Sequence, residues 1–476
     1  MQQLMNRYKT MSKPAKASIW FAICSIIQRG ISMITTPIFT RILTTEEYGT
    51  ISVYNSWFAI IMIFATFELA TGVFNKAMIK YEDDRDGYTS STLFLATCIT
   101  GVFFLVYLIA YDLWNNLFSL NTSFMVMMFV EIIFTEAMQF WSIRQRFDFE
   151  FKNVVIVTLL ANVLGSVLSV VLVLLSPTHK AELKILGTLA VHIIIYGVIY
   201  FKLIRKGKKI YAPEYWKYAI NYNLPLIPHY LSQQILNQSD RIMIDKMIGR
   251  ADAALYTVAY QVAILMNLIT NAVHASFSPW AFQSIRDKDY KKIGDLTLKI
   301  IILMAAVCFL FSLFAPEVIL ILGGSTYTEA VWVVPPVAMS IVFNMLYSLI
   351  GNFAFYFEKT KFVMVGTMGA ALANIILNAI FIPMFGYAAA GYTTLACYIL
   401  YSLLHYFVML RICRENGIEQ PFNTKAIWSV AVVSVLLSII SVFLYRYTIP
   451  RYIVMAMIIG ILFWKRKTIT RIMKLK

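Results

Sequence analysis

The sequence predicts an all-α, polytopic membrane protein with about 14 transmembrane helices, and three observations lead to this prediction. Hydrophobic residues make up 59% of the 476 positions and charged residues only 14%, whereas about a quarter of a soluble globular chain is charged. The apolar residues gather in segments of the roughly 20 residues that a helix needs to cross a bilayer. The Lys and Arg residues, which produce a net charge of +16, lie mainly in the short segments between these apolar runs.

Fourteen apolar segments can be assigned along the chain, and the last has the shortest apolar stretch. It lies between Arg451 and Lys465, so we expect these two cations to extend toward the headgroups. The predicted spans are 17–40, 50–72, 90–111, 117–141, 154–175, 184–201, 218–239, 253–274, 293–314, 331–355, 362–382, 386–410, 426–445 and 449–464.

The distribution of basic residues predicts the orientation of these spans. With the N-terminus in the cytoplasm, the cytoplasmic segments hold 31 Lys and Arg residues. The outside loops hold 8 when Lys184 and Arg451, at the outer ends of their spans, are counted with them. Cytoplasmic loops of membrane proteins are enriched in basic residues, and one missed span would invert every later loop. We therefore expect both termini in the cytoplasm, and we interpret the positive charge as a topological signal rather than as a nucleic-acid-binding surface.

Several classes of function are disfavoured. The five cysteines form no CxxC pair, so we expect neither a disulfide framework nor a metal site. The chain has no phosphate-binding loop of the GxxxxGK[ST] type, no HExxH and no GxSxG motif. We therefore expect a protein that is not an enzyme and that has no cofactor, with a proton or a sodium ion as the candidate coupling ion for transport.

A segment in the first half of the chain recurs in the second half. Residues 41–53 and residues 246–258 both read as a cation, two apolar residues, a short polar turn and the start of an apolar helix. The same offset of 205 positions aligns Gln28 and Arg29 with Gln233 and Gln234. Secondary transporters built from such parallel repeats bind substrate where the repeats meet.

The repeat predicts two pseudo-symmetric six-helix lobes followed by a C-terminal helix pair. The expected parts are a cytoplasmic N-terminal segment (1–16), an N-lobe (17–201), a basic cytoplasmic linker (202–217), a C-lobe (218–410), the helix pair (426–464) and a basic cytoplasmic tail (465–476).

Two motifs suggest a family. Leu43 to Gly49 match a leucine-threonine/serine-x-glutamate-tyrosine-glycine signature, and Pro225, Asp240 and Arg241 match a proline-containing seventh helix that ends in aspartate-arginine. In this order, within fourteen spans, they resemble the polysaccharide-repeat-unit (O-antigen type) flippases of the multidrug/oligosaccharidyl-lipid/polysaccharide exporter superfamily. The resemblance covers essentially the whole chain.

The resemblance implies a V-shaped pair of lobes around a central cavity in a bacterial cytoplasmic (inner) membrane. It implies that an undecaprenyl-pyrophosphate-linked oligosaccharide moves from the cytoplasmic to the outer leaflet by alternating access, for the synthesis of a surface polysaccharide such as O-antigen or capsule. The implied partners are the lipid-linked glycan, the bilayer, and a polysaccharide polymerase or assembly proteins.

Other interpretations stay open at this point. Two belong to the same superfamily: an ion-coupled exporter of drugs or small molecules, and a flippase for a peptidoglycan precursor. A membrane-embedded glycosyltransferase or polymerase is a third, although no outside loop exceeds about 17 residues.

Polar stripes on the spans are the candidate cavity lining, because each sugar hydroxyl in hydrocarbon needs a hydrogen-bonding partner. The alternative for such residues is hydrogen bonding between helices. The candidates are Gln28 in span 1, Gln233 and Gln234 in span 7, Tyr256, Tyr260, Asn267, Asn271 and His274 in span 8, and Asn344 and Tyr347 in span 10.

Arg29 is the most informative single residue. It lies near the middle of span 1, where a cation facing lipid costs at least about 2.5–3.5 kcal/mol. We expect it either to attract the anionic pyrophosphate or an acidic sugar, or to form an ion pair with Glu131 at a comparable depth in span 4.

The remaining candidates concern ion coupling and movement. Glu131, Glu136 and Glu68 are the carboxylates that could carry a coupling ion, and the five-residue spacing of the first two predicts that they point to different helix faces. Pro225 and Pro228 should bend span 7, and the bend is either a hinge for movement of the lobes or a kink with no such role. Asp240 and Arg241 close span 7 at the outer surface, where we expect them to fix the geometry of the lobe.

Overall fold

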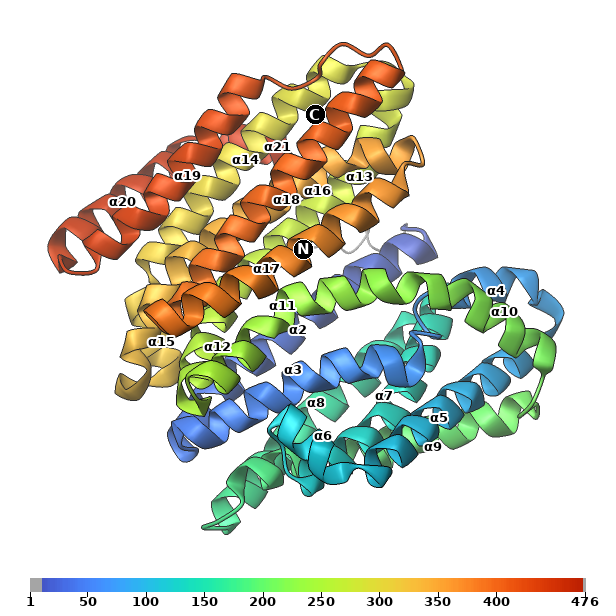
Figure 1. Ribbon diagram of the computed structural model, residues 1–476. Helices are drawn as coiled ribbons and strands as arrows, with labels where there is room; N and C mark the ends of the chain where they lie inside the picture. Colours follow the sequence, from blue (N-terminus) through green and yellow to red (C-terminus); the bar gives the residue numbers. More distant parts are fainter. Residues whose placement is uncertain (1–10, 474–476) are drawn as a thin grey trace. The chain divides into compact units, whose positions relative to one another are not determined.

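The computed structural model describes residues 11–473, and every regular element in this range is a helix. The chain separates into two compact units, Met1–Gln234 and Ile235–Lys476 (Figure 1). The all-helical class predicted from the sequence is confirmed. The units divide inside a helix of the seventh span, whereas the sequence places the division at the linker 202–217.

The first unit is built from helices that overlap the six spans predicted for the N-lobe, joined by shorter helices. Its elements are α2 (Lys13–Ile42), α3 (Thr45–Thr66), α4 (Phe74–Lys80), η1 (Glu82–Asp84), α5 (Arg85–Ile109), α6 (Tyr111–Phe118), α7 (Thr122–Phe147), α8 (Phe151–Leu175), α9 (Lys180–Gly207), α10 (Pro213–Asn223), η2 (Leu224–Leu226) and the first residues of α11 (Ile227–Met247).

The limits of α3 follow from local chemistry. The Thr44 hydroxyl accepts the backbone N–H of Glu47, and the Glu47 carboxylate accepts the backbone N–H of Thr44. This capping box satisfies two donors that a helix start leaves free. The helix ends where Phe67 and Glu68 adopt left-handed conformations, each with φ 51°. The predicted span 50–72 is therefore wrong at both ends, because it overlooked the cap and the left-handed pair.

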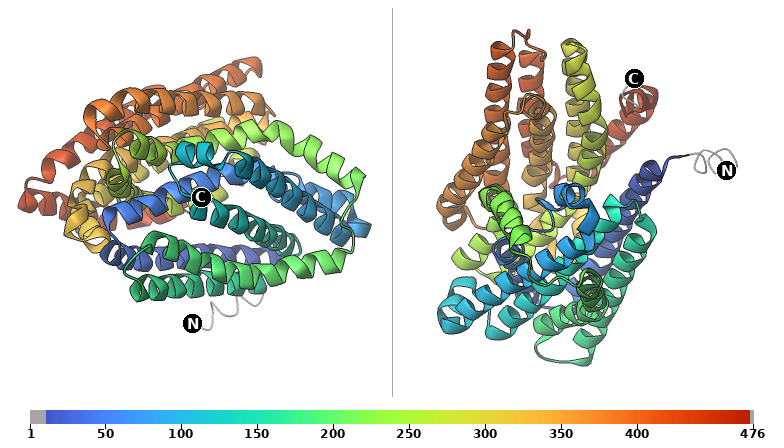
Figure 2. Two further views of the ribbon diagram at one scale, coloured as in Figure 1. Left: turned by 60° about the horizontal axis from the view of Figure 1, so that its bottom comes forward. Right: turned by 90° about the vertical axis from the view of Figure 1, so that its right-hand side faces the viewer.

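Helix α9 packs against α5, α7 and α8 of the first unit. It pairs with α8 through the short connection 176–179 (Figure 2). A Cβ atom on Gly187 would lie 2.6 Å from the backbone N and Cα of Ser169, so only glycine permits this approach. The Ser169 hydroxyl donates to the Lys184 carbonyl at 2.7 Å, which fixes the two helices at this depth.

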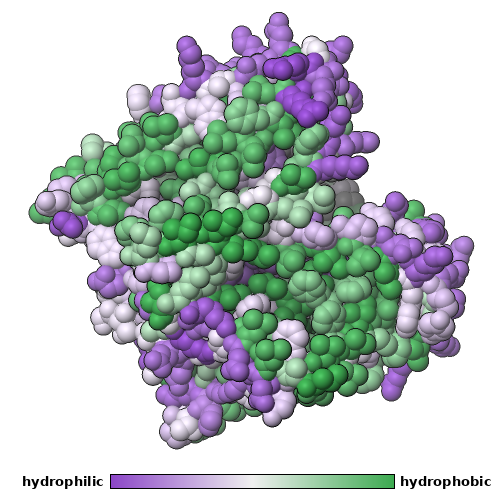
Figure 3. Space-filling model, in the orientation of Figure 1, coloured by the Kyte–Doolittle hydropathy of each residue, from purple (hydrophilic) through white to green (hydrophobic). Residues whose placement is uncertain are grey.

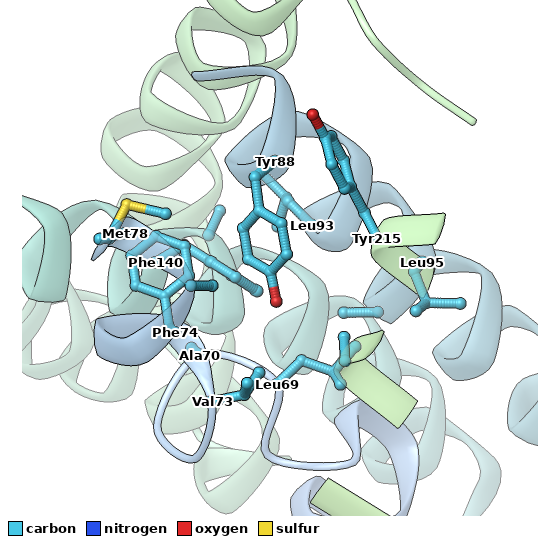
Figure 4. Close-up of a cluster of buried hydrophobic side chains, with 14 residues drawn as sticks. Leu69, Ala70, Val73, Phe74, Met78, Tyr88, Leu93, Leu95, Phe140 and Tyr215 are labelled. Atoms are coloured by element: carbon cyan, nitrogen blue, oxygen red, sulfur yellow. The ribbon is translucent and has the colours of Figure 1, made fainter. Parts of the chain in front are cut away.

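A core of buried apolar side chains joins α4, α5, α7 and α10 (Figure 4). The Phe74 ring meets Phe140 edge-on at 5.0 Å, and Tyr88 lies 5.3 Å from Tyr215 between ring centroids. The Tyr215 hydroxyl donates to Asp84 at 2.7 Å. Burial and this hydrogen bond raise the pKa of Tyr215. The short helix α10, at the start of the seventh span, is thereby packed into the first unit.

The second unit contains the helices of the predicted C-lobe and helix pair. Its elements are the rest of α11, α12 (Arg250–Ile264), α13 (Met266–Arg286), α14 (Tyr290–Leu313), α15 (Ala315–Gly323), η3 (Ser325–Val333), α16 (Val334–Tyr356), α17 (Thr360–Phe385), α18 (Ala388–Glu415), α19 (Thr424–Leu444), α20 (Thr448–Trp464) and α21 (Arg466–Met473). Helix α16 is its core, packed against α13, α14, α18 and α19.

The last span has an anchor that the sequence interpretation missed. Arg451, near the start of α20, is only 4% exposed and forms an ion pair with Glu317 of α15. Tyr452 donates to the same carboxylate oxygen at 2.7 Å. The expectation that Arg451 extends toward the headgroups is therefore wrong, because a carboxylate within the protein neutralises it. Lys465 at the other end is exposed, with its ammonium 4.7 Å from the centroid of the Trp464 ring.

The membrane-spanning character of the chain is clear from helix length and composition. Eleven described helices are long and apolar enough to cross a membrane, and twelve if the bent pair α12–α13 counts as one span. Two predicted spans are not among these helices: α11, the helix of the seventh span, and α20, which has only 17 residues. The number 14 therefore stays a prediction. Apolar residues cover the surfaces of α18 and α19 in one unit and of α5 in the other, while polar residues gather over α4 and α10 (Figure 3).

The internal repeat reappears in the helix boundaries. Helix α2 ends at Ile42 and α3 begins at Thr45, while α11 ends at Met247 and α12 begins at Arg250. Both boundaries recur 205 positions later, the offset found in the sequence. The two units therefore begin with equivalent helix-turn-helix elements.

Candidate substrate-binding and ion-binding residues

The first candidate position is the middle of α2. Gln28 is half-buried and Arg29 is exposed, surrounded along the helix by the exposed apolar residues Ile26 and Ile27. An arginine keeps its charge at any physiological pH. An exposed cation in this apolar stretch can therefore bind an anionic group with little rearrangement of the protein.

Glu131 has partners other than Arg29. The Tyr54 hydroxyl of α3 donates to Glu131 Oε2 at 2.8 Å, and His192 Nδ1 of α9 lies 3.3 Å from Glu131 Oε1. The Tyr196 ring stacks on His192 with 4.5 Å between centroids. Among the described residues, Arg29 and Glu131 form no ion pair with each other, so the predicted structural pairing of these two side chains is wrong. The cluster joins α3, α7 and α9 near the middle of their spans.

His192 was not among the residues that the sequence indicated. The only signal for it was a titratable side chain at the centre of the predicted span 184–201. Its side chain is 16% exposed and that of Glu131 is 13% exposed. Both side chains are therefore largely but not completely buried.

Glu136 and Glu68 form a second acidic region, on the other side of α7. Glu136 is 2% exposed, its Oε1 atom has no hydrogen-bond partner, and the backbone amide of Ala70 contacts the carboxylate. Glu68 lies in the non-helical segment after α3, where Thr71 donates to its Oε2 atom at 2.5 Å. As expected from their spacing, Glu131 and Glu136 contact different neighbours.

The seventh span is broken where the prolines lie. Pro225 occupies the 3-10 turn η2, and Pro228 lies in the first turn of α11. The Asn223 amide donates to the Glu68 carbonyl at 3.2 Å, just before this turn. Of the two glutamines that follow, Gln233 is exposed and Gln234 is half-buried. The break is observed, whereas its use as a hinge stays a prediction.

Asp240 is the centre of a buried hydrogen-bond network in the second unit. Its carboxylate is 0% exposed. It accepts three hydrogen bonds: from the hydroxyl of Tyr256 on α12 at 2.5 Å, from the side-chain amide of Asn378 on α17 at 2.6 Å and from the hydroxyl of Thr394 on α18 at 2.9 Å. The carboxylate therefore lies inside the helix bundle and ties α11 to three other helices, rather than closing the span at a surface.

Arg241 lies beside this network. Its guanidinium is 4.3 Å from the centroid of the Tyr260 ring and donates to the Asn237 carbonyl at 2.6 Å. Tyr256 is fully buried with its hydroxyl bonded to Asp240. Tyr256 was predicted to line a sugar-binding cavity, but its hydroxyl is used in a buried contact between helices instead.

The polar stripe of span 8 does not lie on one continuous helix. Helices α12 and α13 meet at a bend of 43°, so Tyr256 and Tyr260 are on one helix and Asn267, Asn271 and His274 on the next. Asn271 is exposed, whereas Asn267 has a buried Oδ1 atom without a hydrogen-bond partner. His274 Nε2 lies 3.2 Å from the Ser278 hydroxyl.

In span 10, Asn344 and Tyr347 of α16 are half-buried. The Tyr347 ring is 4.3 Å from Tyr401 and 5.2 Å from His405 between centroids. The described residues include no group of three or more His, Cys, Asp or Glu side chains that could hold a metal ion.

Comparison with known proteins places this arrangement in a family. The family model described as "Polysaccharide biosynthesis protein" matches residues 15–285, which is more than half of the chain. The chain belongs to the polysaccharide biosynthesis protein family. A second model, described as MatE, matches residues 225–380 of this polysaccharide biosynthesis family member. The resemblance inferred from the two sequence motifs is confirmed.

Curated relatives of this family member are distant. Putative protein 1 of the Lsg locus of Haemophilus influenzae is 21% identical over 365 residues, covering 74% of this chain and 87% of the relative. An uncharacterized membrane protein of Methanocaldococcus jannaschii is 21% identical over 490 residues, covering 95% of this chain and 94% of the relative.

Solved structures share the fold of this polysaccharide biosynthesis family member. The lipid II flippase MurJ, in an inward closed conformation, matches with a TM-score of 0.71 at 14% identity, covering 95% of this chain and all of that one. An inward-facing multidrug resistance MATE family transporter of the MOP superfamily matches with a TM-score of 0.64 at 15% identity, covering 85% of this chain and all of that one. The chain therefore has the fold of transporters of this superfamily.

Proposed function

We propose that this protein is a flippase that moves an undecaprenyl-pyrophosphate-linked oligosaccharide from the cytoplasmic to the outer leaflet of a bacterial inner membrane, for surface polysaccharide synthesis. Membership of the polysaccharide biosynthesis protein family supports a carbohydrate cargo. The transporter fold supports alternating access. The proposed orientation places both termini in the cytoplasm, in keeping with the basic residues of the cytoplasmic segments.

The observation that carries the proposal is the exposed Arg29 in the middle of α2. A cargo with a pyrophosphate group brings two adjacent anionic phosphates into the membrane region, and a guanidinium binds phosphate with paired hydrogen bonds. Gln233, in the same unit as Arg29, has an exposed amide, and an amide both donates to and accepts from sugar hydroxyls. In this proposal Arg29 holds the charged group while polar side chains such as Gln233 replace water around the glycan.

The test is a deletion strain complemented with variants, in which lipid-linked intermediates on each leaflet are measured. Complete repeat units should accumulate on the cytoplasmic leaflet of the deletion strain. Arg29→Ala should lower transport at least about tenfold, as expected for losing about 1.4 kcal/mol of binding. Arg41→Ala is the matched control, because Arg41 lies at the end of the same helix and donates to the Pro37 carbonyl.

The outcomes of this experiment separate the candidate functions. Normal surface glycan in the deletion strain would overturn the proposal. Unfinished sugars would indicate a glycosyltransferase or polymerase. Accumulation of a peptidoglycan precursor would indicate a lipid II flippase, the activity stated in the name of MurJ. Drug sensitivity with normal surface glycan would indicate a multidrug exporter.

For the coupling ion we propose a proton held between Glu131 and His192. Glu131 Oε1 and His192 Nδ1 lie 3.3 Å apart without the geometry of a hydrogen bond, and a protonated histidine at this distance from a carboxylate forms an ion pair. Tyr54 donates to the same carboxylate, and the ammonium of Lys184 lies close enough to interact with it electrostatically. Protonation of His192 would strengthen the attraction between α7 and α9.

This part of the proposal is tested with the purified protein in liposomes that carry an imposed proton gradient. Glu131→Gln keeps an acceptor for Tyr54 but cannot take part in proton exchange, so transport should no longer respond to the gradient. The matched control is His179→Gln, because His179 and Glu182 form a second His–Glu pair at the start of α9, 3.7 Å apart with His179 largely exposed. A sodium gradient that drives the wild type while the proton gradient does not would refute proton coupling and leave the flippase proposal standing.

A further inference from the structure

A groove of about 730 Å³ runs along the surface of the first unit where α9 faces α7. Its apolar wall contains Ile194, Val198 and Phe201, which are 67%, 67% and 57% exposed. They follow one another at intervals of four and three residues, so they share one face of α9. Large exposed apolar side chains in this arrangement suit contact with an acyl chain.

The floor of this groove is shaped by a glycine. A Cβ atom on Gly197 would lie 3.4 Å from Cε1 of Phe134 on α7. The missing side chain therefore leaves space above the Phe134 ring, between the exposed side chains of Ile194 and Val198. The result is a channel with an aromatic base and aliphatic rims.

Three cations close the C-terminal end of the groove, namely Lys202, Arg205 and Lys206, and in the proposed orientation this end is cytoplasmic. Arg205 and Lys206 follow Lys202 by three and four residues, so each lies beside it on the helix surface, where like charges repel one another. Lys206 is neutralised by Asp86 at 2.9 Å. Among the residues that the structure describes, Lys202 and Arg205 form no ion pair with a carboxylate within 4.0 Å. The end of the groove therefore carries two uncompensated positive charges.

We propose that this groove binds an anionic glycerophospholipid of the cytoplasmic leaflet. Its phosphate would lie against Lys202 and Arg205, and one acyl chain would run along Phe201, Val198 and Ile194. The seven helical steps from Ile194 to Phe201 span about 10 Å, which is less than half of the roughly 30 Å hydrocarbon thickness. The ligand stays within one leaflet, and basic pockets at the cytoplasmic side of helix bundles bind anionic headgroups.

This inference does not depend on the cargo of the proposed flippase, because the groove is lined by residues of α7 and α9 that have no part in the proposed transport. An anionic lipid here would offset the repulsion between the cations at the end of α9. It would thereby stabilise the C-terminal end of α9, where Gly207 lies against the backbone of Asp86.

The test measures lipid binding to the delipidated, detergent-solubilised protein by native mass spectrometry. The probes are phosphatidylglycerol, phosphatidylcholine with the same acyl chains, and inorganic phosphate. The wild type should retain phosphatidylglycerol in preference to phosphatidylcholine. Two headgroup contacts are lost in the double variant Lys202→Ala, Arg205→Ala, which should bind phosphatidylglycerol about 30-fold more weakly.

Two further variants make the result specific to the groove. Val198→Trp fills the channel without changing charge and should also reduce phosphatidylglycerol binding. The double variant Arg466→Ala, Lys467→Ala removes the same charge from exposed positions of α21 and should leave binding unchanged. Equal loss in this control, unchanged binding in both groove variants, or equally strong occupancy by inorganic phosphate would overturn the inference.

Discussion

Removing the carboxylate of Asp240 should loosen the second unit more than the removal of any exposed acidic group. In Asp240→Ala, the hydroxyls of Tyr256 and Thr394 and the amide of Asn378 lose their acceptor. Hydrogen bonds between membrane helices contribute about 0.6 kcal/mol on average and about 1.7 kcal/mol at most. Three such bonds give an expected loss of about 2–5 kcal/mol in the free energy of unfolding.

The assay is reversible unfolding by sodium dodecyl sulfate in mixed micelles, followed by circular dichroism. Asp287→Ala is the control, because Asp287 pairs with Arg286 at an exposed position, and exposed ion pairs contribute about 0–1 kcal/mol. Tyr256→Phe removes a single bond and should cost about one third of the Asp240→Ala effect. If Asp240→Ala unfolds with the same free energy as Asp287→Ala, the network does not hold α11, α12, α17 and α18 together.

Three other changes test contacts that lie outside the proposed transport path. Glu317→Gln should leave the buried Arg451 without its carboxylate, so a reporter fused to the C-terminus should show impaired insertion of α20, whereas unchanged insertion would contradict the anchor. Gly187→Ala would place a Cβ atom 2.6 Å from the backbone of Ser169 and should destabilise the first unit by about 1–3 kcal/mol. Thermal unfolding in detergent measures this loss, and an unchanged transition would exclude close packing of α8 on α9. Tyr215→Phe keeps the ring but removes the hydrogen bond to Asp84, and it should cost about 1 kcal/mol in the same assay, with no loss expected if the hydroxyl is solvated.

Much of the helical layout could be predicted because hydropathy is a one-dimensional signal. A membrane helix must satisfy its backbone internally, so apolar runs such as 154–175 and 426–445 coincide closely with α8 and α19. The prediction failed where a helix end depends on local chemistry. The left-handed Phe67 and Glu68 end α3 early, and the bend between α12 and α13 divides a polar stripe that periodicity had treated as one helix.

The candidate site was predicted less completely, because spacing along one helix gives no distance to another. Arg29 and Glu131 are at comparable depths, which suggested an ion pair, yet Glu131 contacts Tyr54 and His192 instead. Tyr256 fitted a sugar-binding pattern, but it is bonded to Asp240. A polar side chain in a span has several possible partners, and its sequence position does not choose between them.

The sequence by itself determined the helical class, the positions of most spans and the offset of 205 between repeated elements, because these depend on the order of apolar and charged residues along the chain. The tertiary structure alone decided which side chains meet: Asp240 with three helices, Glu131 with His192, and Arg451 with Glu317. The physical reason is that hydrophobicity acts on each segment separately, whereas hydrogen bonds and ion pairs require atoms from different segments to lie within about 3 Å of one another.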